Sequence, residues 1–335
     1  MHVSVFPAYC PCAAKNFLIG RQVKIPTNAG GHNDWHQEKV DSVKSSVGEL
    51  NRPGKFDAIV EYYDYSWLDY RVLWLNRGNL AVHFGYFDEH HRSHAQALEN
   101  LNRVLANHAG IQAGDRVLDA GCGIGGSAIW LAENRQAEVV GIAPVHSQLK
   151  RARQSVERRG VADRVRLLRG DYAQTSFADQ SFDVVWAMES LCHAPSKPAV
   201  YQEFHRVLKP GGRLVIAEYM RTARPLSTAN EHLVNDWLSS WAIPDIDTAG
   251  EHHDAAVAAG FVDIVNRDVT PHIEPSLRHL YRMCLLGVPA DRLLKKLGFR
   301  KKSRNVNGAH KQYLALRAEA WYYSIFTASK PLPGA

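Results

Sequence analysis

The chain has few cysteines and no long apolar run, and each absence narrows the classes of protein that fit. Only five cysteines occur among 335 residues, and their spacing matches neither a zinc site nor a disulfide framework. No apolar run reaches the length that spans a bilayer. Residues 1–14 lack the basic start and apolar core of a secretion signal. We therefore expect a cytoplasmic protein with reduced thiols and no integral membrane segment.

The sequence does not indicate a nucleic-acid-binding protein, because no segment combines basic and aromatic residues as nucleic-acid-binding modules do. The formal net charge of +6 leaves two interpretations open, an anionic partner or an ordinary basic surface. With 45% hydrophobic residues, the chain can bury a full core. We expect one α/β domain with elaborations. The sequence does not specify an oligomeric state.

The most informative segment that is present runs from residue 116 to residue 126. A short apolar run ends in Asp119 and is followed by Gly121, Gly123 and Gly126. This pattern predicts a buried strand that turns sharply into a helix near Ser127. Glycines tolerate positive φ and let a ligand approach the backbone, and the following helix offers unpaired N–H groups. The segment predicts a nucleotide-like ligand.

Two ligand classes use such a turn, and the next strand separates them. A dinucleotide site needs an acidic residue about 20 residues after the glycines. The strand predicted over 138–142 instead leads to Ala143, which has no carboxylate, whereas Gln148 offers an amide to ribose hydroxyls. Asp119, two residues before the first glycine, is typical of class I S-adenosylmethionine (SAM) methyltransferases. The pattern favours SAM over a nicotinamide cofactor.

Three later segments follow in the order that such methyltransferases require. They are a third strand over 165–168 before Gly170, a fourth over 181–186, and a turn and fifth strand over 208–216. Asp171 and Tyr172 suit adenine, since the carboxylate accepts from the exocyclic amine and the neighbouring backbone donates to a ring nitrogen. Asp171 also fits a helix N-cap or a turn residue.

The order of these segments predicts a Rossmann-like, doubly wound α/β sheet. Residues 1–54 show little periodicity and are expected to form a loose N-terminal arm. Residues 55–110 are expected to form a helical cap. Residues 111–335 would form the SAM-binding domain, with sixth and seventh strands over 261–269 and 321–329. The long interval between those strands predicts an inserted helical subdomain at about 271–320.

Glu189 and His193 follow the fourth strand and are the candidate catalytic groups. Ligands of open α/β sheets bind beyond the carboxyl ends of the strands, and residues one helical turn apart share a face. An alcohol acceptor needs a base, whereas an alkene acceptor yields a carbocation that must later lose a proton. The pair suits either chemistry. It also suits a purely structural role.

The predicted cap is dense in aromatic residues and also carries arginines, and the predicted inserted subdomain carries a basic run over 300–304. Aromatic faces stabilise cations, although such rings also pack ordinary cores. Several arginines together would hold a diphosphate, although the 300–304 run also fits a solvated loop. The aromatic residues are Tyr62, Tyr63, Tyr65, Trp67, Tyr70 and Trp74, and the basic ones are Arg71, Arg77 and Arg304.

These motifs together resemble the SAM-dependent methyltransferases grouped around the tocopherol-type, sterol and cyclopropane fatty acid enzymes. The resemblance is carried by residues 117–126, 141–148, 170–172, 188–193 and 209–212, and by the His83-Phe84-Gly85-Tyr86-Phe87-Asp88 stretch. It implies SAM contacts at Tyr62, His83, Gly85 and Met188, besides those at the glycine turn. It does not specify the acceptor.

Residues 63–71 and the long insertion before Trp321 look most like bacterial sodorifen-type C-methyltransferases, which methylate farnesyl diphosphate and cyclise the resulting cation. This resemblance implies that Glu189 or His193 accepts a proton and that Tyr65, Trp67 and Tyr70 guide the cation. Arg71, Trp74, Arg77 and Arg304 would bind the substrate. No Asp-Asp-x-x-Asp motif occurs, so any Mg²⁺ would be bridged by the substrate diphosphate.

The sequence thus predicts a C-methyltransferase that acts on an alkene carbon of a prenyl diphosphate, with farnesyl diphosphate as the first choice. The second hypothesis is an O- or N-methyltransferase of a hydrophobic natural product, with His193 as base. Two further hypotheses are a SAM-binding regulator without chemistry and a nicotinamide dehydrogenase.

Overall fold

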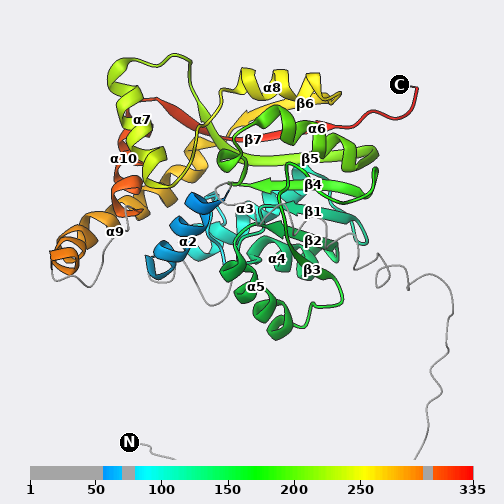
Figure 1. The fold of residues 1–335 in the computed structure, drawn as a ribbon, viewed down its shortest axis with the longest axis horizontal. Coiled ribbons are helices and arrows are strands. Elements are labelled where there is room, and N and C mark those ends of the chain that lie inside the picture. The colour runs from blue at the N-terminus through cyan, green and yellow to red at the C-terminus, as the bar shows by residue number, and fades with distance from the viewer. Residues whose placement is uncertain (1–55, 70–79, 297–304, 335) are drawn as a thin grey trace, which may run out of the picture. The chain divides into compact units, whose positions relative to one another are not determined.

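A seven-stranded mixed sheet organises the molecule (Figure 1). The computed structural model describes residues 56–69, 80–296 and 305–334. The strand order is β3-β2-β1-β4-β5-β7-β6. β1 to β5 pair in parallel, and β7 lies antiparallel between β5 and β6. The strands are β1 (Arg116–Ala120), β2 (Glu138–Ala143), β3 (Val165–Arg169), β4 (Phe182–Met188), β5 (Leu208–Arg221), β6 (Val262–Asp268) and β7 (Trp321–Ser329).

The central strands are apolar because both of their faces are covered. Val117, Leu118 and Trp186 are fully buried, as expected of parallel strands between helices. The seven strands confirm the predicted Rossmann-like α/β fold, and the seventh has the predicted bounds. β5 extends five residues beyond the predicted 208–216. Its last residues pair with β7, with Tyr219 opposite Tyr323 and Arg221 opposite Trp321.

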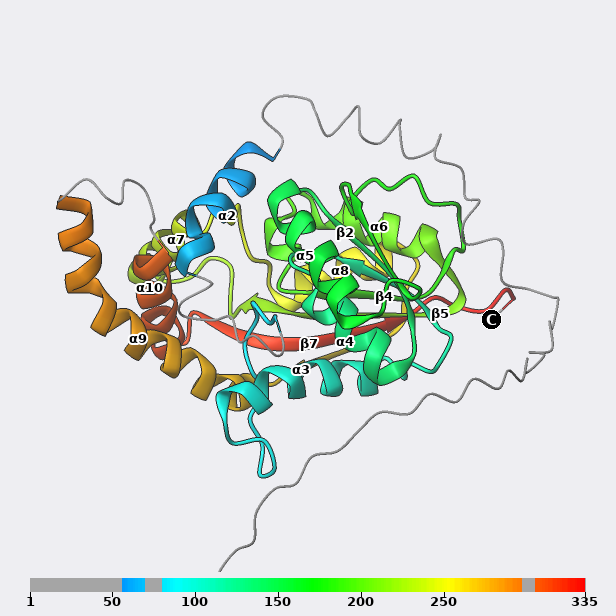
Figure 2. The same cartoon turned by 90° about the horizontal axis from the view of Figure 1, so that it is seen from below.

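Helices α3 (His94–His108) and α4 (Gly126–Arg135) cover one face of the sheet, and α6 (Lys197–Val207) and α8 (Ala249–Ala258) cover the other (Figure 2). α5 (His146–Arg159) packs on β3. Local signals fix the helix starts: Ser93 with Gln96 and Thr248 with Glu251 form capping boxes, which satisfy backbone donors in the first turn.

Four helices lie beyond the carboxyl ends of the parallel strands. They are α2 (Asp57–Asp69), α7 (Thr228–Ser240), α9 (Thr270–Lys296) and α10 (Asn305–Arg317) (Figures 1 and 2). α9 and α10 fall in the interval where the sequence predicts an inserted helical subdomain, and α10 packs on α7 and α9. None of the helices in the described ranges is long and apolar enough to cross a membrane.

The region expected to form a cap divides into two parts in the structure. α3 buries Leu101 and Leu105 in the hydrophobic core, so it is part of the α/β domain and not of a cap. α2 instead lies at the end of the sheet where the glycine turn opens. The expected loose arm over 1–54 lies outside the described residues.

Candidate active site

One cavity joins the turn after β1 to helices α2 and α10. Its volume is about 330 Å³, within the usual range of small-molecule sites. We call the part lined by Asp119, Gly121 and Gln148 the cofactor half, and the part lined by Tyr62, Trp241 and Val306 the acceptor half. The structure therefore places a site at the carboxyl ends of the strands, where open α/β sheets bind ligands.

The glycine turn lines the cofactor half of the cavity. Gly121 has a φ of +103°, and a Cβ there would lie 2.3 Å from the Cβ of Ser190. Gly123 has a φ of +50°, but a Cβ on it would meet no atom within 4 Å. Gly121 is therefore required by protein packing, whereas Gly123 leaves open space beside the backbone, as a bound ligand requires.

Asp119 is a buried carboxyl group that lines the same half of the cavity. Burial raises its pKa to about 7. Its Oδ2 atom has no hydrogen-bond partner within the described ranges. Buried polar atoms normally have partners, so this oxygen suits a ligand that brings a hydrogen-bond donor. SAM fits this requirement, because its ammonium group and its ribose hydroxyls are hydrogen-bond donors.

The predicted ribose and adenine contacts surround this carboxyl group. Ala143 and Gln148 both line the cavity, so the amide stands where an acidic residue is missing. Asp171 lines it too, and its Oδ1 accepts from the Ala173 N–H at 2.8 Å, as in a turn. Tyr172 also lines it, and its hydroxyl donates to the Ser190 carbonyl at 2.6 Å.

His83 and Met188 also line the cavity. The buried His83 ring donates from Nδ1 to the Phe84 carbonyl at 2.8 Å, and burial lowers its pKa to about 4. The Ser127 hydroxyl lies 4.0 Å from the Met188 Sδ. Contact of either residue with SAM stays a prediction.

Aromatic and aliphatic side chains line the acceptor half of the cavity. Tyr62 and Tyr63 come from α2, and they form an edge-to-face pair with ring centroids 5.0 Å apart. The Tyr62 hydroxyl donates to the Asn305 Oδ1 at 3.1 Å, which ties α2 to α10. Other members of this wall are Phe56, Ile59, Phe84, Tyr219, Trp241, Ile243 and Leu280.

Glu189 lines the cavity directly after β4, and hydrogen bonds hold its carboxylate in place. Its Oε1 accepts from the Phe84 N–H at 2.9 Å and from the Tyr323 hydroxyl at 2.8 Å. Its Oε2 accepts from the Tyr219 hydroxyl at 2.6 Å. Burial raises the pKa of this carboxyl group to about 7, while the three donors act in the opposite direction. The backbone of Glu189 has a φ of +49°, a strained conformation typical of functional positions.

His193 ends the short 3₁₀ helix η3 (Leu191–His193) and lines the same cavity. Its Nδ1 faces the Ala242 carbonyl at 3.3 Å, and its Nε2 lies 3.2 Å from the Tyr63 hydroxyl. A carbonyl only accepts, so Nδ1 carries the proton and Nε2 accepts from Tyr63. Burial lowers the pKa of His193 to about 4, so the ring is neutral at pH 7.

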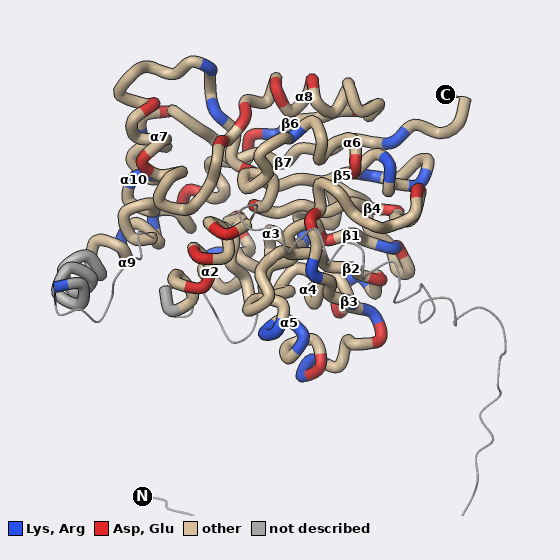
Figure 3. The backbone as a smooth tube through the Cα atoms, in the orientation of Figure 1, with Lys and Arg blue, Asp and Glu red and all other residues tan. Residues whose placement is uncertain are grey.

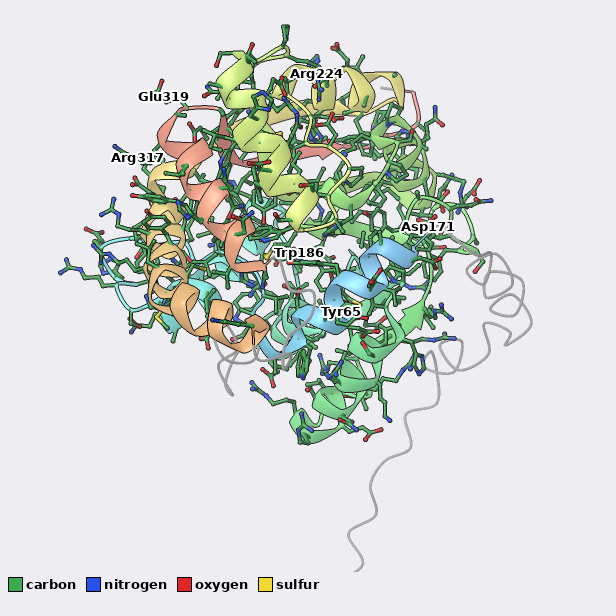
Figure 4. All side chains as sticks on the ribbon, turned by 60° about the vertical axis from the view of Figure 1, so that its left-hand side comes forward. Tyr65, Asp171, Trp186, Arg224, Arg317 and Glu319 are labelled. Carbon is green, nitrogen blue, oxygen red and sulfur yellow. The ribbon has the colours of Figure 1, made fainter. Side chains whose placement is uncertain are left out.

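The structure does not bring all predicted residues to the cavity. Tyr65 is 52% exposed on the outer side of α2 (Figure 4). Trp67 instead lies under the Arg151 guanidinium, 4.0 Å from its ring centroid. Gly85 packs on α3, because a Cβ there would lie 2.8 Å from the Ala97 Cβ. Tyr70, Arg71, Trp74, Arg77 and Arg304 lie outside the described residues.

The Trp67 contact belongs to the junction of α2 with α5. The Ser147 hydroxyl donates to Asp64 at 2.5 Å, next to the Arg151 contact. α2 carries acidic residues, and α5 carries lysines and arginines (Figure 3). Opposite charges therefore favour the position of α2 at the open end of the cofactor half.

Sequence reasoning missed the two tyrosines that hold Glu189. Tyr219 and Tyr323 lie on neighbouring antiparallel strands more than 100 residues apart, and the register of β5 on β7 brings them together. Each is an aromatic residue in an apolar strand, which is an ordinary core pattern. A paired hydroxyl facing a glutamate is visible only once the register is known.

The charged residues of the cavity wall are acidic. Among the described lining residues there is no lysine or arginine, whereas Asp119, Asp171 and Glu189 are present. No cluster of histidine, cysteine, aspartate or glutamate that could hold a metal ion occurs in the described part of the chain.

Comparison with known proteins gives the class. Residues 118–216 match a family model described as a methyltransferase domain. The sterol 24-C-methyltransferase of Pneumocystis carinii is 31% identical over 222 residues, which is 66% of this chain and 56% of that enzyme. The chain spans about half the length of the curated relatives it matches.

Solved structures show the same fold. The mycolic acid cyclopropane synthase CmaA1, complexed with S-adenosylhomocysteine, superposes with a TM-score of 0.70 at 18% identity, over 82% of this chain and 98% of that one. Geranyl diphosphate C-methyltransferase from Streptomyces coelicolor A3(2), in complex with Mg²⁺, geranyl diphosphate and S-adenosylhomocysteine, has a TM-score of 0.64. It is also 18% identical, over 83% and 98% of the two chains.

The family match shows a methyltransferase domain over residues 118–216, as the glycine turn predicts, and the solved structures show the fold of such enzymes. Within that class, the chain is related to the sterol 24-C-methyltransferases.

Proposed function

We propose that this protein transfers a methyl group from SAM to an alkene carbon of a prenyl diphosphate, with farnesyl diphosphate as the first substrate to test. The observation that carries the proposal is the continuity of the cavity. The cofactor half and the aromatic wall of the acceptor half belong to one cavity, which Glu189 also lines. An apolar chamber with one fixed carboxylate suits a hydrocarbon acceptor that becomes positively charged.

The residues of the cofactor half would hold SAM by its polar groups. Asp119 and Gln148 accept from donors on the ligand, and the open side of Gly123 lets it approach the backbone. When bound, SAM supplies an electrophilic methyl group that the alkene π electrons take as the C–S bond breaks, its electron pair passing to sulfur. Holding the two reactants together supplies much of the catalysis.

The acceptor half would then handle the positive charge left on the adjacent carbon. Faces of Tyr62, Tyr63 and Trp241 stabilise a cation by about 0.5–2 kcal/mol each. The Glu189 carboxylate balances the charge. It then takes a proton from a neighbouring C–H bond, whose electron pair forms the new double bond. A coupled cyclisation would place ring closure before this proton loss.

Other proteins support the choice of acceptor. The curated relative is a sterol 24-C-methyltransferase by name, and one structural neighbour contains geranyl diphosphate and Mg²⁺. The described cavity wall offers no lysine or arginine to a diphosphate. The proposal keeps the resemblance-based assignment of the diphosphate to Arg71, Arg77 and Arg304, which lie outside the described residues; a Mg²⁺ would be held through the diphosphate.

A second candidate is an O- or N-methyltransferase with His193 as base. The neutral ring at the cavity, with Nε2 as its acceptor atom, favours it. The hydrogen bond from Tyr63 to the same Nε2 weakens it, because that lone pair is already used.

The deciding experiment is incubation with SAM and farnesyl, geranyl or geranylgeranyl diphosphate, followed by mass analysis. A product heavier by one methylene unit, with the diphosphate retained or lost on cyclisation, would support the proposal. No turnover of any of the three would refute it. Turnover of a phenol or amine, with loss of activity in His193→Ala only, would establish the second candidate.

A further inference from the structure

We propose that Tyr219 and Tyr323 are positioning residues that keep the Glu189 carboxylate ionised and aimed into the cavity. This inference rests on the proposed function, in which Glu189 takes the proton from the methylated cation. Neither tyrosine is assigned by the sequence motifs.

The first step is the number of lone pairs left to Glu189. An ionised carboxylate has about four acceptor sites. The hydroxyls of Tyr219 and Tyr323 and the N–H of Phe84 use three of them. One site remains for the cavity that Glu189 lines. Three donors around one carboxylate therefore favour both its charged form and its direction.

The second step is that these hydroxyls are held by their rings. The Tyr219 ring contacts Trp237 and Trp321 edge-on, with centroids 5.2 Å and 5.5 Å apart. Phe84 contacts the Tyr323 ring, with centroids 5.8 Å apart. Both tyrosines are almost completely buried. Packing fixes the rings, so replacing either tyrosine by phenylalanine would remove a donor and leave the cluster filled.

The third step concerns the protonation state. A hydrogen bond donated to a carboxylate favours its ionised form, while burial favours the neutral form. Burial is the largest effect on the pKa of Glu189, which lies at about 7. The other ionisable groups that act on Glu189 are the two tyrosines, Glu218 on β5 and Cys192 on η3. No cation lines the described wall, so among the described residues the Tyr219 hydroxyl, the Phe84 N–H and the Tyr323 hydroxyl are the groups that favour the charge.

The direct test follows the protonation of Glu189 in the whole protein without substrate, by infrared difference spectroscopy across pH. Glu189→Gln identifies the protonated carboxyl band by removing it. Tyr219→Phe and Tyr323→Phe should each raise the titration midpoint by about one pH unit, and the double variant by more. Unchanged midpoints in both single variants would overturn the proposal.

Tyr201→Phe is the matched control. Tyr201 is as buried as Tyr219, and its hydroxyl is 2.8 Å from the His252 Nδ1, away from the cavity lining. The Tyr201→Phe variant loses one buried hydroxyl and should leave the titration midpoint of Glu189 unchanged. A similar shift in this variant would show a general effect of lost packing and would also overturn the proposal.

Turnover supplies the second readout. Because the ionised carboxylate is the active form, kcat rises with pH through the pKa of Glu189. A shift of one unit lowers kcat about fivefold at pH 7 and changes it little at pH 9, with KM within about threefold. If the midpoints shift but no prenyl diphosphate is turned over, the proposed function fails while the role of the tyrosines in ionising Glu189 stands. Equal losses of kcat at pH 7 and pH 9 would overturn the positioning role.

Discussion

The two halves of the cavity are built in different ways. The cofactor half is built from short segments that follow neighbouring parallel strands, with the glycine turn after β1 as its main element and Gln148 and Asp171 beside it. The acceptor half gathers side chains from α2, the 83–87 loop, β5, β7 and α10. Backbone geometry can be encoded locally, whereas a wall of side chains depends on the whole fold.

This difference teaches where specificity resides. The cofactor half recognises a ligand common to a large class, and short segments that follow neighbouring strands suffice for that. The acceptor half has to fit one substrate and one cation, so its residues are free to come from anywhere at the carboxyl ends of the strands. Substitutions should therefore separate binding of SAM from turnover of the acceptor.

The largest expected effect is that of Glu189→Gln. The amide keeps the size of the side chain but accepts no proton, so kcat should fall by about 10²–10⁴-fold. The dissociation constant of SAM, measured by calorimetry, should stay within about threefold. Loss of SAM affinity comparable with the loss of kcat would contradict the division of the cavity into two halves.

Gly121→Ala should give the next largest effect. The new Cβ would lie 2.3 Å from the Ser190 Cβ at a φ of +103°, so we expect destabilisation by about 2–4 kcal/mol. Because the turn would have to shift, we also expect weaker binding of SAM. Chemical denaturation and calorimetry measure the two quantities.

Gly123→Ala is the matched comparison within the same turn. No atom lies within 4 Å of its Cβ position, so the free energy of unfolding should fall by only about 1 kcal/mol. The affinity for SAM should still fall strongly, since the methyl group enters the space left for the ligand. Normal SAM binding by this variant would show that the ligand does not approach Gly123.

Asp119→Asn tests the electrostatics of the cofactor half. The folded-state pKa of Asp119 is raised to about 7 from 3.8. Between these two pH values the folded protein therefore binds a proton at Asp119 that the unfolded chain does not. The stability it contributes is present below pH 4 and is lost as pH rises through 7. Glu189 and Glu218 shift in the same direction.

We therefore expect the ligand-free protein to lose stability between pH 5 and pH 8. The Asp119→Asn variant should lose less over this range, by on the order of 3 kcal/mol. Thermal unfolding at several pH values measures this. An unchanged slope in the variant would show that Asp119 does not titrate in this range.

The sequence predicts the cofactor half well for a physical reason. Asp119, the glycines and Gln148 follow strands whose hydrophobic runs are unmistakable, and parallel strands bring their carboxyl ends to one edge. The pairing of Tyr219 with Tyr323 depends instead on the register of antiparallel strands distant in sequence. Tyr65 and Trp67 show a different difficulty. They share the composition of the aromatic run, but the rotation of α2 turns them from the cavity.

The smallest effect should distinguish two tyrosines on that helix. Tyr63 lines the cavity and donates to the His193 Nε2, whereas Tyr65 is 52% exposed. Removing the Tyr63 hydroxyl leaves a buried nitrogen without its donor, which costs about 1 kcal/mol. Tyr63→Phe should therefore lower kcat/KM for the acceptor by about threefold to tenfold, and Tyr65→Phe by less than twofold. Steady-state kinetics with a saturating SAM concentration measures both. If Tyr65→Phe costs as much as Tyr63→Phe, the catalytic role inferred from composition is right and the assignment by the orientation of α2 is wrong.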